Sequence, residues 1–162
     1  MRFIKRLLGI LPFSYVYAHC DIPCGVYDPT PLQIASHTVL RMTQLLTDVE
    51  KEEDGIAREH KIARLTHVKE EHGEKVEDEL GTLENDYFKD EHFAAHEDLK
   101  DLLSQSVALS IKTRQGIDLA TAQELLEKVL LISEIFYKTK NVTPVRVKSL
   151  YPTGQEIVTY TA

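Results

Sequence analysis

The sequence of 162 residues contains no tryptophan, only two cysteines and too few basic residues to balance its acids, with a formal net charge of −7. Two cysteines cannot supply the disulfide framework of many small exported domains. The acidic excess argues against a nucleic-acid partner, because clustered lysine and arginine make phosphate contacts. With 43% hydrophobic residues, the chain can bury one sizeable core, and its length predicts a single folded domain.

The first 18 residues differ in composition from the rest of the chain. Three cations and no acid accompany an apolar run over residues 7–16, and Ala18 follows as a small residue. This layout is typical of a secretory signal peptide. The run is shorter than the roughly 20 residues of a membrane span. We therefore expect residues 1–18 to be a leader cleaved after Ala18, with no stable membrane span in the mature chain; the alternative is an N-terminal tail that touches a membrane.

Four stretches have apolar residues at the three- and four-residue spacing of an amphipathic helix. The expected helices cover about residues 31–51, a long stretch from Gly55 to about 85, residues 91–114, and a stretch that follows Asp118. Thr30 is the expected N-cap of the first helix and Asp118 that of the fourth. Short connections, including one at residues 85–90, predict an all-α fold, an antiparallel four-helix bundle.

Within the third predicted helix, the apolar spacing indicates one buried side. The residues expected there are Phe93, Leu99, Leu102, Leu103, Val107 and Ile111. Residues 141–162 differ from the helical part, because two alternating segments flank Pro152 and Gly154. We expect this short C-terminal extension to be either a small hairpin or a tail.

The sequence after Ala18 reads His-Cys-Asp-Ile-Pro-Cys. Cleavage there makes His19 the N-terminus, so that its amine and imidazole, the amide shared with Cys20 and the Cys20 sulfur become donors. The turn at Pro23 brings Cys24 back as a second thiolate. A flat N2S2 set with an axial imidazole favours nickel or copper, whereas zinc prefers a tetrahedral set. Without cleavage the His19 nitrogen is an ordinary amide, so processing is an expected part of the mechanism.

Residues 19–29, His-Cys-Asp-Ile-Pro-Cys-Gly-Val-Tyr-Asp-Pro, resemble the N-terminal signature of nickel-containing superoxide dismutases. The resemblance continues at Asp-Tyr-Phe-Lys (86–89) and Ile-Phe-Tyr-Lys-Thr-Lys (135–140). It implies a four-helix-bundle domain over residues 19–140, with a metal hook at 19–27, assembled as a homo-hexamer. It also implies one nickel ion per subunit, cycling between Ni(II) and Ni(III) as superoxide is disproportionated to dioxygen and hydrogen peroxide.

The same resemblance implies which residues hold and shape the metal site. The nickel ligands of the family match His19, Cys20 and Cys24 of this sequence. Asp21 is expected to help shape the hook, and the peptide bond before Pro23 is expected to be cis. Because related enzymes have short prosequences that dedicated peptidases remove, a processing peptidase is an expected partner.

Two tyrosines flank the open face of the metal in the family and limit access to it. They match Tyr27 and Tyr87 of this sequence. Lys89 follows the second tyrosine by two residues, and its charge could help to attract superoxide. The alternative is that this lysine is only a solvated surface residue.

Two positions depart from the family pattern. Better-known members hold the axial imidazole with a glutamate on the first helix and an arginine on the second, where this sequence has Ala35 and His72. A hydrogen-bond partner usually fixes the orientation of a ligand imidazole. His72 lies on the predicted apolar stripe, so it either takes over that role or is a core histidine bonded to a neighbour.

Other functions suit parts of the sequence less well. A di-iron site of the ferritin type requires Glu-x-x-His pairs, and no histidine here follows a glutamate at that spacing. His92 and His96 are spaced either as a zinc pair or as residues of a solvated helix face. The hook would also suit a nickel or copper protein for storage or sensing, and an oxidised cysteine pair would suit a purely structural bundle.

The cellular location has two opposite indications. The leader suggests export to a periplasmic or extracellular space, whereas the family resemblance suggests the cytoplasm. Export would expose both thiols to oxidation before a metal is bound. The order of cleavage, metal loading and transport is therefore an open question at this point.

Overall fold

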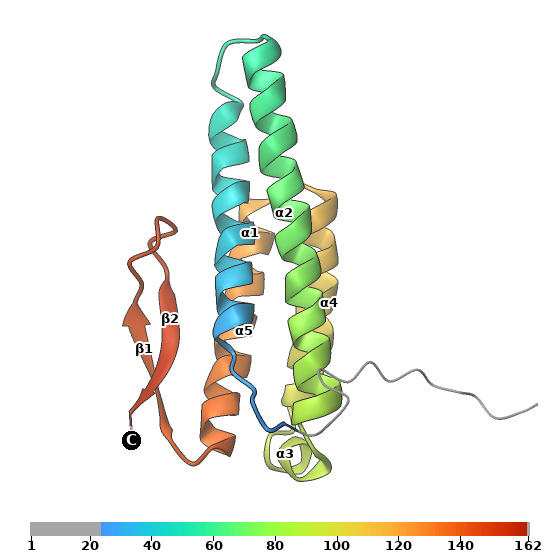
Figure 1. The fold of residues 1–162 in the computed structure, drawn as a ribbon, viewed down its shortest axis with the longest axis vertical. Helices are drawn as coiled ribbons and strands as arrows, with labels where there is room; N and C mark the ends of the chain where they lie inside the picture. Colours follow the sequence, from blue (N-terminus) through green and yellow to red (C-terminus); the bar gives the residue numbers. More distant parts are fainter. Residues whose placement is uncertain (1–23, 162) are drawn as a thin grey trace, which may run out of the picture.

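The computed structural model describes residues 24–161, and its long helices form a bundle (Figure 1). These helices are α1 (Thr30–Val49), α2 (Ile56–Thr82), α4 (Leu99–Gln115) and α5 (Leu119–Thr139). Helix α1 packs against α2 and α5, and α4 packs against the same two helices. The predicted all-α, antiparallel four-helix bundle is confirmed.

The segment between α2 and α4 differs from the prediction. A π-helical turn, η1 (Leu83–Tyr87), continues α2, and the Phe88 N–H donates to the Leu83 carbonyl over 2.8 Å. The short helix α3 (Asp90–Ala95) follows, and His96 then leaves helical geometry with φ −133° and ψ 84°. The connection expected at 85–90 is therefore partly helical, and the single helix expected at 91–114 is two. The 3.6-residue period cannot reveal a π turn, because that turn inserts one extra residue into the pattern.

One of the two predicted N-caps is confirmed. The Asp118 carboxylate caps α5 by accepting from the Ala120 N–H over 2.9 Å, and Gly116 follows the last residue of α4. The expected Thr30 cap is wrong. Thr30 is already the first residue of the helix, so the cap must come from a residue before it. The Asp28 carboxylate accepts from the Thr30 N–H over 2.7 Å, which is one of the free N–H groups at the start of the helix.

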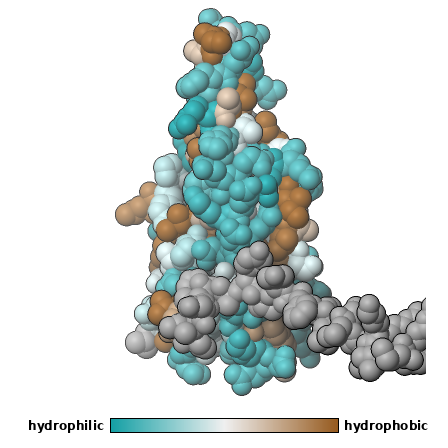
Figure 2. Space-filling view, turned by 45° about the vertical axis from the view of Figure 1, so that its right-hand side comes forward, coloured by the Kyte–Doolittle hydropathy of each residue, from teal (hydrophilic) through white to brown (hydrophobic). Residues whose placement is uncertain are grey.

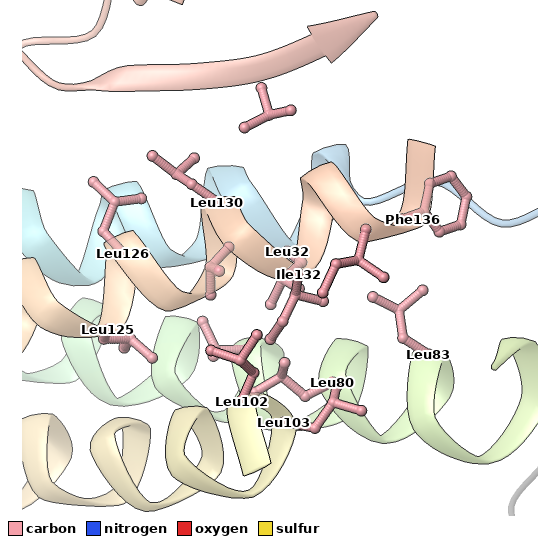
Figure 3. Close-up of a cluster of buried hydrophobic side chains, with 14 of the residues drawn as sticks. Leu32, Leu80, Leu83, Leu102, Leu103, Leu125, Leu126, Leu130, Ile132 and Phe136 are labelled. Atoms are coloured by element: carbon pink, nitrogen blue, oxygen red, sulfur yellow. The ribbon is translucent and has the colours of Figure 1, made fainter. Parts of the chain in front are cut away.

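The core lies where the four long helices face each other (Figure 3). Its labelled side chains come from every long helix: Leu32, Leu80, Leu83, Leu102, Leu103, Leu125, Leu126, Leu130, Ile132 and Phe136. Each fully buried leucine stabilises the fold by about 1.5–3 kcal/mol relative to an exposed one. Helix α5 is the central helix, because it contacts α1 and α4 and also the C-terminal strands.

Helices α2 and α4 pack closely through small and polar residues. The Ser110 hydroxyl donates to the Gly73 carbonyl over 3.0 Å, and a Cβ on Gly73 would lie 2.5 Å from Arg114 Cγ. Ile111, expected on the buried side, is 40% exposed, so that expectation is wrong. Ser106, Ser110 and Thr113 are buried instead, because only short side chains fit where the two backbones approach.

Lys69 is buried between α2 and the end of α4. Its ammonium group donates to the Thr113 carbonyl over 2.5 Å and also to the Gly116 carbonyl. These carbonyls belong to the last turn of α4 and the residue after it, where no further helical N–H is available. Burial lowers the pKa of Lys69, and the neighbouring Glu70 opposes that shift.

The C-terminal extension is a hairpin, which decides between the two alternatives. Strands β1 (Thr143–Lys148) and β2 (Glu156–Thr161) are antiparallel, and the hairpin lies beside α1 and α5 (Figure 1). The Gln33 amide exchanges two hydrogen bonds with the backbone of Val158, at 3.0 and 2.7 Å. Arg146 of β1 pairs with Glu127 and Glu134 of α5.

His37 of α1 is buried beneath the tip of this hairpin. Its Nε2–H donates to the Glu156 carbonyl over 3.0 Å, so its Nδ1 accepts from the Thr153 hydroxyl over 2.9 Å. The ring also meets that of Tyr151 edge to face, at 4.9 Å between centroids. Burial lowers the pKa of His37 below its ordinary value of 6.5.

The outer surface is largely hydrophilic on the face seen in Figure 2. The exposed large apolar side chains are spread over several elements, as with Ile56 on α2, Ile117 before α5 and Leu150 in the hairpin turn. Among residues 24–161, no helix combines the length and the apolar character needed to cross a bilayer.

Substitution Lys69→Met tests the buried lysine. It keeps the aliphatic stem but removes the donor from the buried Thr113 carbonyl and from the Gly116 carbonyl, so the free energy of unfolding should fall by about 2 kcal/mol in urea titrations. Lys100→Met is the control, because Lys100 is exposed on α4, and it should change stability by less than about 0.5 kcal/mol. Equal effects of the two substitutions would contradict this assignment.

Acid should weaken the hairpin through His37. The folded state holds this ring neutral, so its contribution is fully present above pH 6.5 and is lost as the pH falls through and below that value. The slope from one such group is at most about 1.4 kcal/mol per pH unit. Urea unfolding at pH 7.5 and 5.5 should therefore show a smaller pH dependence for His37→Gln than for the unsubstituted protein. His60→Gln, on the exposed face of α2, should leave the dependence unchanged.

Candidate metal centre

Cys24 is the one predicted metal ligand within the residues that the structure describes. Its side chain is exposed, and the Val26 N–H points at its sulfur over 3.5 Å. The thiolate is the form of cysteine that binds metals. The predicted ligands His19 and Cys20 lie outside the described residues.

The other predictions for the hook concern the same undescribed segment. Asp21, Pro23 and the expected cis bond before Pro23 lie outside the described residues, as does the leader, residues 1–18. Within residues 24–161, no three His, Cys, Asp or Glu side chains are grouped as a metal site would need, and this includes the surroundings of His92 and His96.

The structure brings the two predicted tyrosines together. The ring of Tyr27 lies on that of Tyr87, with 5.4 Å between centroids and 50° between planes. The sequence separates them by 60 positions, but the segment before α1 runs to the same end of the bundle as α3 (Figure 1). Cys24 is three residues before Tyr27, so this contact holds the thiol near the α3 end of the bundle.

Tyr87 is the centre of an aromatic cluster. Its ring packs against those of Phe136 at 4.5 Å, Phe88 at 5.1 Å and His92 at 5.7 Å, and the last pair is stacked with 19° between planes. The residue is only 8% exposed. Tyr87 is the last residue of the π turn, and Phe88 follows it in extended geometry; both side chains are buried.

The end of α5 supplies two further contacts to Tyr87. The tyrosine hydroxyl lies 2.5 Å from Thr139 Oγ1, and Lys140 Nζ lies over the ring, 4.7 Å from its centroid. We did not predict roles for Thr139 or Lys140 from the sequence. Their place in the Ile-Phe-Tyr-Lys-Thr-Lys segment was the available signal, because that segment carries part of the family resemblance.

The segment around Lys89 holds the start of α3 in place. Lys89 is exposed, and its ammonium group donates to the Asp86 carbonyl over 2.7 Å. The Lys89 N–H donates to His92 Nδ1 over 3.1 Å, which caps α3. His96 lies after the last residue of α3, so the two histidines do not have the helical spacing on which the zinc-pair hypothesis is based, and no third His, Cys, Asp or Glu joins them among the described residues.

His72 and Ala35 line one pocket between α1 and α2. The pocket has a volume of about 660 Å³ and is also lined by Asp28, Lys75 and Glu79. His72 Nδ1 lies 2.9 Å from the Val68 carbonyl, so this nitrogen carries a proton and donates it. In the neutral ring, Nε2 is then the acceptor. His72 is half-buried at the pocket, whereas its neighbour Gly73 faces α4.

The fold and the residues around Tyr27 and Tyr87 agree with comparisons to known proteins. The family profile of nickel-containing superoxide dismutase matches residues 14–140 of the chain. The chain belongs to this family. It is an oxidoreductase that acts on superoxide, and its cofactor is nickel. Family membership favours the enzyme over the storage protein, the sensor and the structural bundle.

The similar proteins cover the helical part of the chain. A nickel superoxide dismutase of Streptomyces seoulensis is 34% identical over 137 residues, which are 85% of this chain and 98% of the relative. Its counterpart in Streptomyces coelicolor is 33% identical over the same length. A native structure of nickel superoxide dismutase has a TM-score of 0.67 at 31% identity and covers 75% of this chain and 99% of its own. The hairpin lies beyond residue 140, where the family match ends.

Proposed function

We propose that this superoxide dismutase holds its nickel ion with His19, Cys20 and Cys24, in a hook that forms after cleavage behind Ala18. The observation that carries the proposal is the contact between Tyr27 and Tyr87. It ties the chain three residues after Cys24 to the α3 end of the bundle. The donors that precede Cys24 in the sequence are then confined to the same region.

The donor chemistry of the segment fits nickel. Two thiolates, an N-terminal amine, an amide nitrogen and the imidazole of His19 would hold the ion, and this mixture of nitrogen and sulfur donors suits nickel. The Val26 N–H, 3.5 Å from Cys24 Sγ, gives this sulfur a backbone contact on the bundle side of the hook. When bound, nickel supplies one-electron chemistry by cycling between Ni(II) and Ni(III), as superoxide is disproportionated to dioxygen and hydrogen peroxide.

The aromatic pair limits access to the hook in this proposal. Tyr87 is buried in a cluster of rings, so it forms a fixed wall, and Tyr27 covers it from the side of the hook. Two cations lie near this wall: Lys140 over the Tyr87 ring and the exposed Lys89. Their positive potential would draw a small anion toward this end of an otherwise acidic protein.

We also propose that His72 fixes the orientation of the His19 imidazole. Its Nδ1–H is donated to Val68, so the neutral ring offers Nε2 as an acceptor to a second N–H donor. The pocket beside it reaches Asp28, four residues after Cys24, and is about 660 Å³ in volume. Ala35 leaves this space open, since it has no side chain beyond Cβ. A ring N–H of His19 could therefore be held here without the glutamate or arginine of better-known members.

Processing and assembly complete the proposal. A peptidase removes residues 1–18, and the mature chains assemble as a homo-hexamer. The leader favours an exported enzyme, in which nickel must be bound before the two thiols are oxidised. N-terminal sequencing of the mature protein from each cell fraction, combined with native mass measurement, tests the cleavage site, the location and the number of subunits together.

Loss of either cysteine should abolish nickel binding. Cys20→Ser and Cys24→Ser each remove one thiolate, so nickel content should fall from about one per chain to background, and dismutase activity with it. Elemental analysis of the purified, cleaved protein measures this. Thr30→Ser, which keeps the first turn of α1, is the control and should retain full nickel. Nickel retained by either cysteine variant would refute the ligand assignment.

A protein that keeps even one residue before His19 should also lose activity. The His19 nitrogen is then an amide, which is a much poorer donor than a free amine. The measurement compares the correctly cleaved protein, which begins at His19, with one that begins at Ala18, at equal nickel supply. Full activity in the longer protein would contradict the chelate.

His72→Ala should lower dismutase activity with little loss of bound nickel, because it removes the partner of the axial ring and not a ligand. Loss of such a partner typically costs ten- to a hundredfold in activity or metal affinity. Pulse-radiolysis rates and nickel content, measured together, separate the two effects. His67→Ala, on the exposed face of the same helix, is the control. Unchanged rates in His72→Ala would favour a purely structural histidine.

A further inference from the structure

The contacts of Thr139 show in which direction the hydroxyl proton of Tyr87 points. Thr139 Oγ1 lies 2.6 Å from the Phe136 carbonyl and 2.5 Å from the Tyr87 hydroxyl. A carbonyl oxygen only accepts, so the single hydroxyl proton of Thr139 is donated to Phe136. Thr139 can then only accept from Tyr87, and the Tyr87 proton points to Thr139.

The ring of Tyr87 is held so that this direction persists. Phe136 packs against it at 4.5 Å, His92 stacks on it at 5.7 Å, and Lys140 Nζ lies 4.7 Å from its centroid. A cation over a ring face is attracted by the electrons of that face. With the ring 8% exposed and enclosed in this way, the hydroxyl has little freedom other than rotation about its own C–O bond.

We infer that Thr139 is a positioning residue. By accepting the hydrogen bond from Tyr87, it holds the Tyr87 hydroxyl proton toward the protein interior, so that only the oxygen lone pairs face the proposed nickel site. An oxygen that only accepts cannot donate to an anion and repels one at short range. Tyr87 therefore keeps anions from resting at the entrance, while Lys140 and Lys89 supply the attraction. This role rests on the proposed function, in which Tyr87 flanks the hook.

Inhibition by a small anion tests the inference in the nickel-loaded protein. In Thr139→Val the acceptor is lost with little change in shape, so the Tyr87 hydroxyl can turn and donate to azide. The inhibition constant for azide should fall about tenfold, as expected for one hydrogen bond to a charged group. Thr139→Ser restores the oxygen and should restore the original constant.

A double-substitution cycle shows whether Thr139 acts through the Tyr87 hydroxyl. In the Tyr87→Phe background, Thr139→Val should have no effect on azide inhibition, because no hydroxyl remains to be released. Thr47→Val is the matched control on α1. Its hydroxyl also donates to a carbonyl of the preceding turn, over 3.0 Å, and is exposed. This control should leave azide inhibition unchanged.

The nickel-free protein provides a second readout, independent of activity. Ultraviolet resonance Raman spectra report whether a phenol hydroxyl donates a hydrogen bond, and subtraction of the Tyr87→Phe spectrum isolates Tyr87 from the other four tyrosines of the chain that begins at His19. The unsubstituted protein and Thr139→Ser should show a donating phenol. Thr139→Val should shift the Tyr87 signal, because the hydroxyl exchanges the threonine acceptor for water.

Several results would overturn the inference. They are unchanged azide inhibition in Thr139→Val, the same tenfold change in the Tyr87→Phe background, or a Tyr87 signal that does not respond to Thr139. Loss of nickel from Thr139→Val but not from Thr139→Ser would also overturn it, since Thr139 would then act on the fold. Failure of the ligand assignment is a separate result, because it appears as nickel retained by Cys24→Ser, whereas the Raman result needs no nickel.

Discussion

The contact between Tyr27 and Tyr87 connects the two parts of the molecule on which its chemistry depends. The helical bundle is stable through its own core, whereas the segment before α1 has few contacts of its own, with Cys24 and Val26 exposed. A ring–ring contact of 5.4 Å gives this segment a fixed point on the bundle. In the proposed site, this contact supplies the wall that restricts access to the metal.

That contact depends on how the chain leaves α2. The π turn η1 adds one residue, and Tyr87 and Phe88 both become buried at the end of the bundle where α5 finishes. Thr139 and Lys140 reach Tyr87 from that end of α5. A π turn is less stable than an α-helical one and is often found at functional sites, which agrees with its position here.

The hairpin is an addition to the part of the chain that resembles the family. It is attached by Gln33 and His37 of α1 and by Arg146 to α5, and it contacts neither the π turn nor α3 to any large extent. The hairpin and the pocket beside His72 therefore use different residues of α1: Gln33 and His37 hold the hairpin, whereas Ala35 lines the pocket. The hairpin therefore extends the core of the bundle and leaves the α3 end open.

The sequence by itself determined the helical bundle, the family and the candidate ligands. Periodic apolar residues specify a buried helix face, and the spacing of His19, Cys20 and Cys24 specifies a set of donors that are adjacent in the chain. Such local patterns can be recognised in the amino-acid sequence alone. The buried part of α5, with Leu125, Val129 and Ile132, is of the same kind.

Only the tertiary structure decided which distant residues meet. The contacts of Thr139 and Lys140 with Tyr87 join segments that are about 50 residues apart, and the π turn before them was visible only in the structure. Periodicity also failed at Ile111, because the close approach of α2 and α4 admits only short side chains. These features depend on the distance between two segments of backbone in the folded protein, and no local sequence pattern specifies that distance.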